Sequence, residues 1–277
     1  MRFLNVAGYR FVPIDDLAIL RERLRGACLA AGLRGTVLLA PEGINLFLAG
    51  LPDMVDAWLV ALRDDARFAG LEVKRSWSEH QPFNRMLVKL KKEIITMRAP
   101  QIRPLSARAP QVDAATLKRW LDAGHDDSGR AVALLDTRNA FEVEIGGFAG
   151  AIDLGIKSFG EFPERVLALE GSLNSKTVVT FCTGGIRCEK AALYMRDKGF
   201  DNVHQLDGGI LKYFEDVGGA HYRGDCFVFD RRVALTPRLQ EAGYAECFNC
   251  RAAVAPAAQA SPDYRVGASC PLCVGAR

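Results

Sequence analysis

The stretch VVTFCTGGIRCEKAALY, residues 178–194, carries the features from which the fold and chemistry of this chain are predicted. A β-branched apolar run ends at Cys182, two glycines and an arginine follow, and the residues after Cys188 have the composition of a helix. A buried strand that passes through a glycine loop into a helix is typical of a parallel sheet, and such sheets bind ligands at the carboxyl ends of their strands. Cys182 stands at one of these ends.

Helix and strand patterns alternate on both sides of this stretch, throughout residues 113–222. Helices are expected at 113–123, near 161–170 and after Cys188. Strands are expected at 131–138, 177–182 and 202–206. This alternation predicts a central α/β domain in which helices cover both faces of a parallel sheet.

Residues 1–98 are predicted to form a second compact unit. Its expected order is strand, helix, two strands, helix and strand, which is the order of a ferredoxin-like α+β fold. The helices are expected at 17–31, capped by Asp15 or Asp16, and at 52–66. Strands are expected at 9–13, 35–40, 44–50, 73–78 and 86–97. Residues 99–112 hold three prolines and are interpreted as a linker or a wrapping arm.

Composition places the chain among ordinary globular proteins. It has 277 residues, of which 49% are hydrophobic and 25% charged, with a net charge of +3. The N-terminus has no apolar core typical of a signal peptide, and no apolar run is long enough to cross a membrane. We therefore expect a cytoplasmic protein. In that reducing compartment, its eight cysteines are better interpreted as metal ligands or reactive thiols than as disulfides.

The loop after Cys182 is built to stabilise an anion. Gly184 and Gly185 have access to backbone angles closed to other residues, so successive N–H groups can point inward. The following helix adds the positive end of its dipole, and Arg187 adds a charge. We therefore predict a Cys182 pKa below the usual value for a thiol. The alternative is a small buried apolar side chain at a strand end.

The number of residues between the cysteine and the arginine distinguishes two chemistries. Cysteine phosphatases use Cys-x5-Arg, whereas Cys182 and Arg187 are separated by four residues. The tighter ring favours one extra sulfur atom, a persulfide on Cys182, over a phosphoryl group. Cys188 is interpreted either as a second reactive thiol or as a helix residue packed beneath the loop, and both interpretations stay open. Cys226 is expected to lie buried in a short strand.

The C-terminal segment, residues 223–277, contains two cysteine pairs with the pattern CxxC-x19-CxxC. Four thiolates at this spacing can complete a tetrahedral zinc site. The segment is too short and irregular for a large core, so a structural zinc is expected to stabilise it as a cysteine-rich zinc knuckle. The alternatives are two disulfides or idle thiols. The predicted ligands are Cys247, Cys250, Cys270 and Cys273.

Three signatures within residues 113–222 resemble a rhodanese domain. They are the Asp-x-Arg-x3-Glu pattern in 135–142, the Gly-Ala turn in 147–152 and the Gly-Gly turn in 206–210. Over residues 1–250 the chain also resembles a narrower family, the tRNA uridine 5-hydroxylases. That resemblance rests on APEGIN at 40–45, KEII at 92–95, FCTGGIRCEKA at 181–191 and GGILKYFE at 208–215.

This resemblance implies an enzyme, an oxidoreductase that places a hydroxyl group on C5 of the wobble uridine of tRNA. Molecular oxygen is then the co-substrate, and Cys182 is the residue expected to carry a persulfide or an oxygenated sulfur. The implied partners are the anticodon loop of tRNA and a sulfur or electron donor that the sequence does not identify. Two other functions stay open. One is a rhodanese-type sulfurtransferase that moves sulfane sulfur to a small molecule or protein acceptor, and the other is a non-enzymatic zinc- and RNA-binding adaptor.

Binding of an anticodon loop requires cations for its phosphates and planar groups for its bases. Basic and aromatic residues alternate near the end of the first unit, around Trp77 and Phe83. The alternative is an ordinary solvated strand face. Glu42, in a tight turn, is expected to make a polar contact either to RNA or to the rhodanese-like domain. The candidate RNA-binding residues are Lys74, Arg75, Lys91, Lys92 and Arg98.

Overall fold

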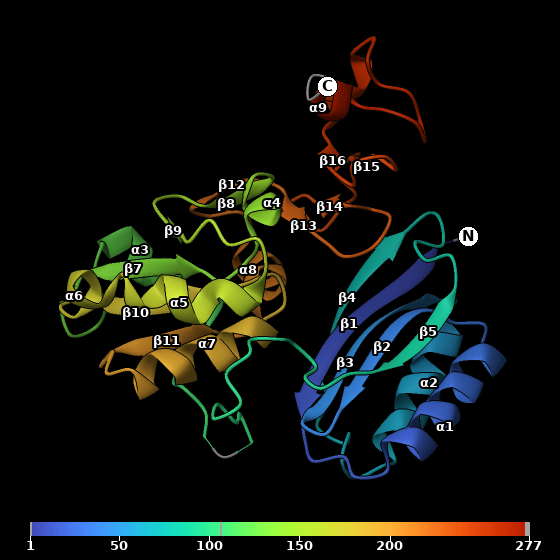
Figure 1. The fold of residues 1–277 in the computed structure, drawn as a ribbon, viewed down its shortest axis with the longest axis horizontal. Helices are drawn as coiled ribbons and strands as arrows, with labels where there is room; N and C mark the ends of the chain where they lie inside the picture. The colour runs from blue at the N-terminus through green and yellow to red at the C-terminus, as the bar shows by residue number, and fades with distance from the viewer. Residues whose placement is uncertain (1, 106, 275–277) are drawn as a thin grey trace.

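The computed structural model describes residues 2–105 and 107–274 and has a mixed α/β fold with two sheets. The N-terminal sheet, blue to teal in Figure 1, lies beside the second sheet, and the C-terminal segment projects from the same end of both units. Among the described residues, no helix is long and apolar enough to cross a membrane.

The N-terminal sheet has the strand order β4-β1-β3-β2-β5. Its strands are β1 (Phe3–Phe11), β2 (Arg34–Ala40), β3 (Gly43–Gly50), β4 (Val73–Ser78) and β5 (Met86–Leu90). Helices α1 (Leu17–Ala30) and α2 (Pro52–Arg63) lie together on one face (Figure 1). The predicted strand–helix–strand–strand–helix–strand order is therefore confirmed, and the strand predicted from residue 86 is present as β5, an edge strand parallel to β2.

Side chains of β1 alternate between the two faces of this sheet. Leu4 and Val6 point toward the helices and belong to the first hydrophobic core, whereas Asn5 and Tyr9 point to the opposite face. The alternation begins at Phe3, so the strand starts six residues before the predicted Tyr9. The face without helices is thereby left for contacts with the rest of the chain.

Two local predictions in the N-terminal unit were wrong. The strand predicted for 86–97 ends at Leu90, because the Glu93 carboxylate accepts hydrogen bonds from the backbone N–H groups of Met97 and Arg98 and closes a turn. Asp16 does precede α1, but its side chain does not cap the helix. It pairs with Arg67 instead.

The second sheet has the strand order β6-β11-β10-β7-β9, and every neighbouring pair is parallel. Its strands are β6 (Gln111–Val112), β7 (Val132–Asp136), β9 (Ile152–Asp153), β10 (Thr177–Phe181) and β11 (Val203–Leu206). Two hydrophobic clusters on its two faces confirm the predicted helix–sheet–helix layers. Around it lie α3 (Ala114–Ala123), α5 (Phe162–Leu167), α6 (Glu170–Leu173), α7 (Ile186–Asp197) and α8 (Gly209–Val217).

The segment between the two sheets wraps around the second one. Met97, Ala99, Ile102 and Ala109 are buried in a core cluster of the parallel sheet, and β6 joins that sheet as its edge strand. Of the two interpretations for residues 99–112, the described part therefore fits the wrapping arm. Its apolar side chains fix it in place although its sequence is rich in proline.

The C-terminal part begins with a hairpin that bridges the two sheets. It is formed by β13 (Cys226–Phe227) and β14 (Ala234–Leu235). The Arg231 N–H donates to the Pro82 carbonyl (3.2 Å), and the Arg232 guanidinium donates to the Ser76 hydroxyl (2.7 Å). A second small hairpin follows, of β15 (Ala245–Glu246) and β16 (Ala253–Val254), and the described chain ends in α9 (Pro271–Val274).

Candidate active site

Cys182 follows β10 directly and begins the loop that leads into α7. Its side chain is 1% exposed, and the N–H of Gly185 donates to its Sγ over 3.1 Å. Gly185 has φ +94°, a conformation that favours glycine, as predicted. Gly184 has no positive φ, so the prediction of special backbone angles was wrong for this residue.

The first turn of α8 is hydrogen-bonded to the cysteine loop. The N–H groups of Ile210 and Leu211 donate to the carbonyls of Cys182 (2.9 Å) and Thr183 (3.1 Å). Gly209 permits this approach, because a Cβ there would lie 2.5 Å from the Cys182 carbonyl oxygen. The Gly-Gly turn at 208–209 is therefore a packing requirement of the loop.

The surroundings of Cys182 favour its thiolate. Burial raises the pKa of a thiol. Here, however, a hydrogen bond from the Cys188 thiol, the charge of Arg187, and the backbone N–H groups of Arg187 and Gly185 together lower the pKa of Cys182 to about 6. The predicted direction is thus supported by named contacts.

Arg187 is buried and paired, which the sequence interpretation did not foresee. Its guanidinium donates to both carboxylate oxygens of Glu142 (2.7 and 2.8 Å). Arg187 therefore lowers the pKa of Cys182 through its positive charge and its backbone N–H. The carboxylate of Glu142 balances part of that charge. Glu142 belongs to the signature at 135–142. It stands three residues after Asn139, at a capping-box position, and this spacing was the one local pattern that could have marked Glu142 as structurally important.

Cys188 lies beneath the loop in the first turn of α7 and is fully buried. Its Sγ is 3.8 Å from the Thr137 hydroxyl. Burial, together with the hydrogen bond to Cys182 and the charge of its thiolate, raises the pKa of Cys188 well above the usual value. The described position matches the packed-residue interpretation and places the Cys188 thiol where it favours the Cys182 anion. Cys226 is also buried, in β13, as expected.

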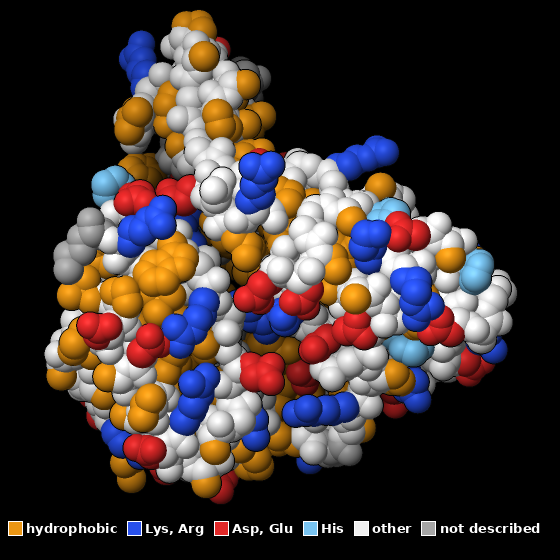
Figure 2. All heavy atoms as spheres, turned by 180° about the vertical axis from the view of Figure 1, so that it is seen from behind, with side chains coloured by type: hydrophobic (Ala, Val, Ile, Leu, Met, Phe, Trp, Pro, Cys, Tyr) orange, Lys and Arg blue, Asp and Glu red, His pale blue; other side chains and the backbone are white. Residues whose placement is uncertain are grey.

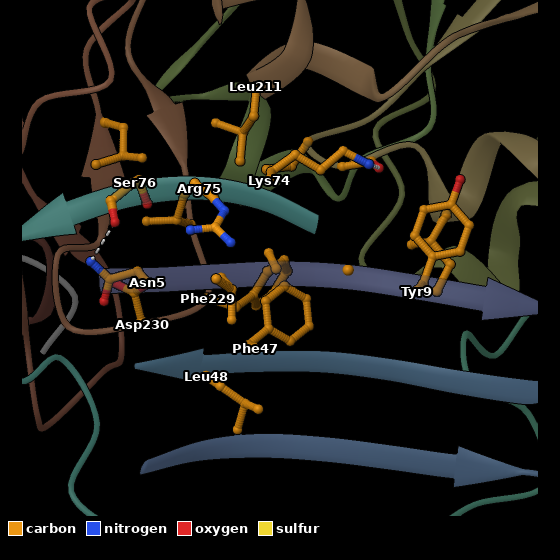
Figure 3. A pocket seen from close by; sticks show the side chains of 18 of the residues that line it. Asn5, Tyr9, Phe47, Leu48, Lys74, Arg75, Ser76, Leu211, Phe229 and Asp230 are labelled. Carbon is orange, nitrogen blue, oxygen red and sulfur yellow. Dashed lines mark hydrogen bonds between the residues drawn. The ribbon is translucent and has the colours of Figure 1, made fainter. Parts of the chain in front are cut away.

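The N-terminal sheet reaches the cysteine loop from the other side. Lys74 of β4 donates from Nζ to the Gly184 carbonyl over 3.1 Å, and its ammonium lies 5.4 Å from the centre of the Tyr9 ring. The Tyr9 hydroxyl donates to Glu189 of α7 over 2.9 Å. Figure 3 shows Lys74 extending toward Tyr9. Burial lowers the pKa of Lys74, and the nearby negative charge of Cys182 opposes that effect.

A buried lysine fixes the two units together next to this contact. The Lys190 ammonium donates to Glu42 (2.8 Å), Glu93 (2.7 Å) and the Ile95 carbonyl (3.1 Å). Of the two contacts considered for Glu42, the one to the rhodanese-like domain is therefore confirmed. This ion-pair cluster holds the N-terminal sheet in place over the loop.

A cavity of about 80 Å³ opens between the sheet face, the cysteine loop and the bridging hairpin. The N-terminal sheet contributes Phe47 and Lys74 to its wall, the loop contributes Cys182, and the hairpin contributes Phe229 and Arg232. Figure 3 shows Phe47 and Phe229 close to one another, and their ring centres are 6.4 Å apart. Neither aromatic residue was singled out in the sequence, because no local pattern links either one to Cys182.

The predicted RNA-binding residues do not form one cluster. Lys74 and Arg75 lie on β4, whereas Lys91 and Lys92 follow β5 at the opposite edge of the sheet. Lys74 contacts the cysteine loop, and Arg75 is exposed and paired with Asp56. The side chains of Lys91, Lys92 and Arg98 are exposed. Strand order therefore places these residues at two edges of the sheet, and their contact with RNA stays a prediction.

The four terminal cysteines converge as predicted. Their Sγ atoms all lie within 4.8 Å of one another, with 4.0 Å between Cys247 and Cys273 and 3.6 Å between Cys250 and Cys270. In a tetrahedral site with zinc–sulfur bonds of about 2.3 Å, sulfurs lie about 3.8 Å apart. The donor set therefore fits a zinc ion.

Two family models match this chain. A UPF0176 acylphosphatase-like domain matches residues 3–94, and a rhodanese-like domain matches residues 113–216. A Cupriavidus taiwanensis protein named tRNA uridine(34) hydroxylase is 59% identical over 277 residues, covering 100% of this chain and 98% of that protein. A Burkholderia ambifaria protein of the same name is 58% identical over 280 residues, covering 100% and 99%.

One solved structure is also similar to part of the chain. It is the rhodanese-like domain of an Anabaena protein, with 26% identity and a TM-score of 0.34, and it covers 42% of this chain and 79% of that one.

Proposed function

The chain belongs to the tRNA uridine(34) hydroxylase family, and from this premise we propose that it hydroxylates C5 of the wobble uridine in tRNA. Molecular oxygen is the co-substrate. One oxygen atom enters the C–H bond, and the other leaves as water with two protons and two electrons from a donor still to be identified. The observation that carries the proposal is Cys182, whose surroundings favour a thiolate at the wall of a cavity shared by three parts of the chain.

We propose Cys182 as the reactive residue and a persulfide on its Sγ as the working form. The N–H of Gly185 donates to this sulfur, and the Arg187 charge and N–H favour its anion. Gly184 leaves open space above the loop, since a Cβ there would meet no atom within 4 Å. Cys188 keeps its own proton, favours the Cys182 anion from beneath the loop, and acts as a positioning residue.

A rhodanese-type sulfurtransferase is the competing function, because the cysteine loop alone supports it. The cavity favours the hydroxylase. Lys74 and Tyr9 of the N-terminal sheet complete its wall, and transfer of sulfur to a small acceptor requires no such second domain. A cavity whose walls come from both domains suits a large substrate such as tRNA, which can contact both domains at once.

Nucleoside mass spectrometry of tRNA from a deletion strain tests this function. We expect nucleosides derived from 5-hydroxyuridine to disappear and to return with the wild-type gene but not with Cys182→Ser. Normal amounts in the deletion strain would reject the hydroxylase function. Full rescue by Cys182→Ser would reject the role of the sulfur and leave the activity itself intact.

We also propose that the four terminal cysteines hold a structural zinc ion as a zinc knuckle. Their sulfur–sulfur distances support this ligand set, and the core around them consists only of a few residues such as Val254 and Tyr264. The ion would supply the stability that this small core lacks. Metal analysis of the purified protein is expected to find about one zinc per chain, and less than half of that would contradict the proposal.

The division of labour that we propose follows the two sheets. Residues 1–98 contact the tRNA, 99–112 connect, 113–222 form the rhodanese domain with the cysteine loop, and 223–277 carry the metal. The reaction then takes place in the cytoplasm, where tRNA is found. The lysine and arginine side chains proposed to meet RNA phosphates are Lys74, Arg75, Lys91, Lys92 and Arg98.

Salt dependence tests the exposed part of this set. Lys91→Ala with Lys92→Ala removes two cations, so the slope of log affinity for tRNA against log salt concentration is expected to fall by about two. An unchanged slope would remove these lysines from the RNA-binding surface without affecting the proposed reaction.

A further inference from the structure

Phe229 separates the Cys182 cavity from a second one. The second cavity is open to solvent and holds about 350 Å³, and its wall includes Phe83, Phe227, Arg231 and Arg251. Phe229 and Phe83 line both cavities, together with Val228 and Asp230, so these residues form the partition between them. Figure 2 shows apolar side chains in a hollow below the projecting C-terminal segment, with charged side chains around it.

The Phe229 ring is exposed beside an anchored segment of the chain. It is 45% exposed, and the residues that follow it are bonded to the N-terminal sheet. The Arg231 N–H bonds to the Pro82 carbonyl, and Arg232 bonds to Ser76 and to Asp230, so the turn is attached to the N-terminal sheet. An aromatic side chain that is exposed next to an anchored backbone has a face available for a ligand.

Further aromatic rings continue the surface on each side of Phe229. The Phe227 ring centre lies 5.0 Å away and the Phe47 ring centre 6.4 Å away, and the Arg187 guanidinium lies 5.8 Å from the Phe229 ring centre. Planar rings of this kind are the platforms on which unpaired bases of single-stranded RNA stack. The Cys182 cavity thus has an aromatic wall next to its reactive sulfur.

The second cavity offers charge for a phosphate. Arg251 forms an ion pair with Glu246, and Asp230 forms one with Arg232. Arg231 is exposed, and within residues 2–105 and 107–274 no carboxylate lies within ion-pair distance of its guanidinium. A positive charge beside an aromatic partition fits the backbone of a nucleotide better than it fits an apolar or cationic partner.

We propose that Phe229 is a wedge that a single-stranded RNA loop straddles. The uridine to be hydroxylated enters the cavity at Cys182, and an adjacent nucleotide lies in the second cavity with its phosphate at Arg231. The aromatic ring takes the place of the neighbouring base in the stack, which offsets part of the cost of extracting the uridine. This inference rests on the proposed function and names the residues that would place the substrate.

Binding of an anticodon stem-loop RNA tests the wedge with two substitutions at one position. Phe229→Leu keeps the apolar bulk and removes the aromatic face, whereas Phe229→Trp keeps an aromatic face. Both are made in a Cys182→Ser background so that no turnover occurs. We expect the dissociation constant to rise on the order of tenfold for leucine and to stay within about twofold for tryptophan.

A fluorescent base in the RNA makes the test specific for stacking. Two stem-loops carry 2-aminopurine on the 5′ or the 3′ side of the wobble uridine, and its fluorescence reports on stacking. We expect the fluorescence of one of them to be quenched by the protein with the native Phe229 and by Phe229→Trp, and not by Phe229→Leu. Ile19→Ala, an exposed apolar change on α1, is the control and is expected to bind like wild type.

Arg231→Gln examines the second cavity separately. We expect it to lower the salt slope of stem-loop binding by about one, because one phosphate contact is lost. Arg25→Gln, an exposed arginine on α1, is the matched control with an unchanged slope.

The results separate the wedge from the proposed function. Wild-type affinity and quenching in Phe229→Leu, or no binding of the stem-loop by wild type, would overturn the wedge. The nucleoside analysis of the deletion strain decides the hydroxylase function independently. A further Phe229→Leu variant that retains Cys182 is the control for folding. If the alkylation of its Cys182 depends on pH as in wild type, the loop has stayed intact, and weakened binding then supports the wedge.

Discussion

The cysteine loop and the terminal cysteine cluster use the same side chain in opposite ways. Cys182 is surrounded by donors and charge, namely the Gly185 N–H, the Cys188 thiol and Arg187. The sulfurs of the terminal cluster have one another as neighbours, all within 4.8 Å. The protein itself stabilises an anion at Cys182, whereas four converging thiolates repel one another and require a cation. The surroundings of a cysteine therefore decide whether it acts as a reactive group or as a ligand.

The largest expected effect is on the protease resistance of the terminal segment, and removal of the metal should change it without affecting the cysteine loop. Cys250→Ser, or treatment with a chelator, would leave the terminal segment without the proposed zinc ion and with a small core. We expect limited proteolysis after Tyr244 to accelerate by at least about tenfold, with Cys182 alkylation unchanged. Equal protease resistance with and without the metal would show that the cluster is not what holds this segment together.

The next effect tests how strongly the cysteine loop depends on buried charge. Glu142→Gln leaves the Arg187 guanidinium buried without its carboxylate partner. We expect the free energy of unfolding to fall by about 3 kcal/mol, measured by urea denaturation. Asp127→Asn removes the partner of Arg119 in an exposed pair, and we expect little change in the free energy of unfolding, because solvent screens such a pair. Similar losses in both variants would contradict the distinction.

A smaller effect concerns the thiol beneath the loop. Cys188→Ala removes the hydrogen bond that helps to lower the pKa of Cys182 to about 6. Since the pKa of Cys182 then rises, less thiolate is present at pH 6, and we expect alkylation there to slow by roughly tenfold. The rates should converge at alkaline pH, where the thiolate predominates in both proteins. Mass spectrometry of the peptide containing Cys182 measures the rate.

Cys28→Ala is the control for this profile. Cys28 is buried in the N-terminal core, and burial raises its pKa to about 12, so its removal is expected to leave the Cys182 profile unchanged. A shift of equal size in both variants would mean that a general loss of packing, and not the Cys188 hydrogen bond, sets the reactivity of Cys182.

The smallest effect comes from the N-terminal sheet. Lys74→Met removes an ammonium group that contacts the Gly184 carbonyl near Cys182. We expect alkylation of Cys182 at pH 6 to slow by about two- to threefold, because a nearby cation favours the thiolate. Lys89→Met, on β5 at the opposite edge of the sheet, is the control. No difference between the two variants would limit Lys74 to a structural contact.

Local patterns in the sequence were sufficient for much of the fold and for part of the site. The alternation of strands and helices around Cys182 predicted the parallel sheet, and the two CxxC pairs predicted the convergence of the four terminal sulfurs. Each of these patterns is made of residues only a few positions apart. Hydrogen bonding within one turn and the period of a strand or helix fix such geometry before any tertiary packing occurs.

The same reasoning failed where distant segments meet. Lys74 and Lys91 were grouped by their nearness in sequence, but strand order carried the two to opposite edges and set Lys74 against a loop 110 residues further along the chain. Arg187 was expected to add its charge to the loop, but its carboxylate partner, Glu142, lies 45 residues earlier in the chain and was not foreseen. The sequence around each of these residues shows that its side chain is charged, but it does not show which distant residue the side chain contacts.

By itself, the sequence determined which residues are candidates for chemistry: the cysteine that follows β10, the glycine turn after it and the four terminal cysteines. Only the tertiary structure decided what surrounds them, namely Lys74 and Tyr9 from one sheet and Phe229 from a hairpin that bridges both. The physical reason is one of range. A strand end and a CxxC pair are set by bonds between near neighbours, whereas a cavity wall is set by how separate elements bury their apolar faces against each other.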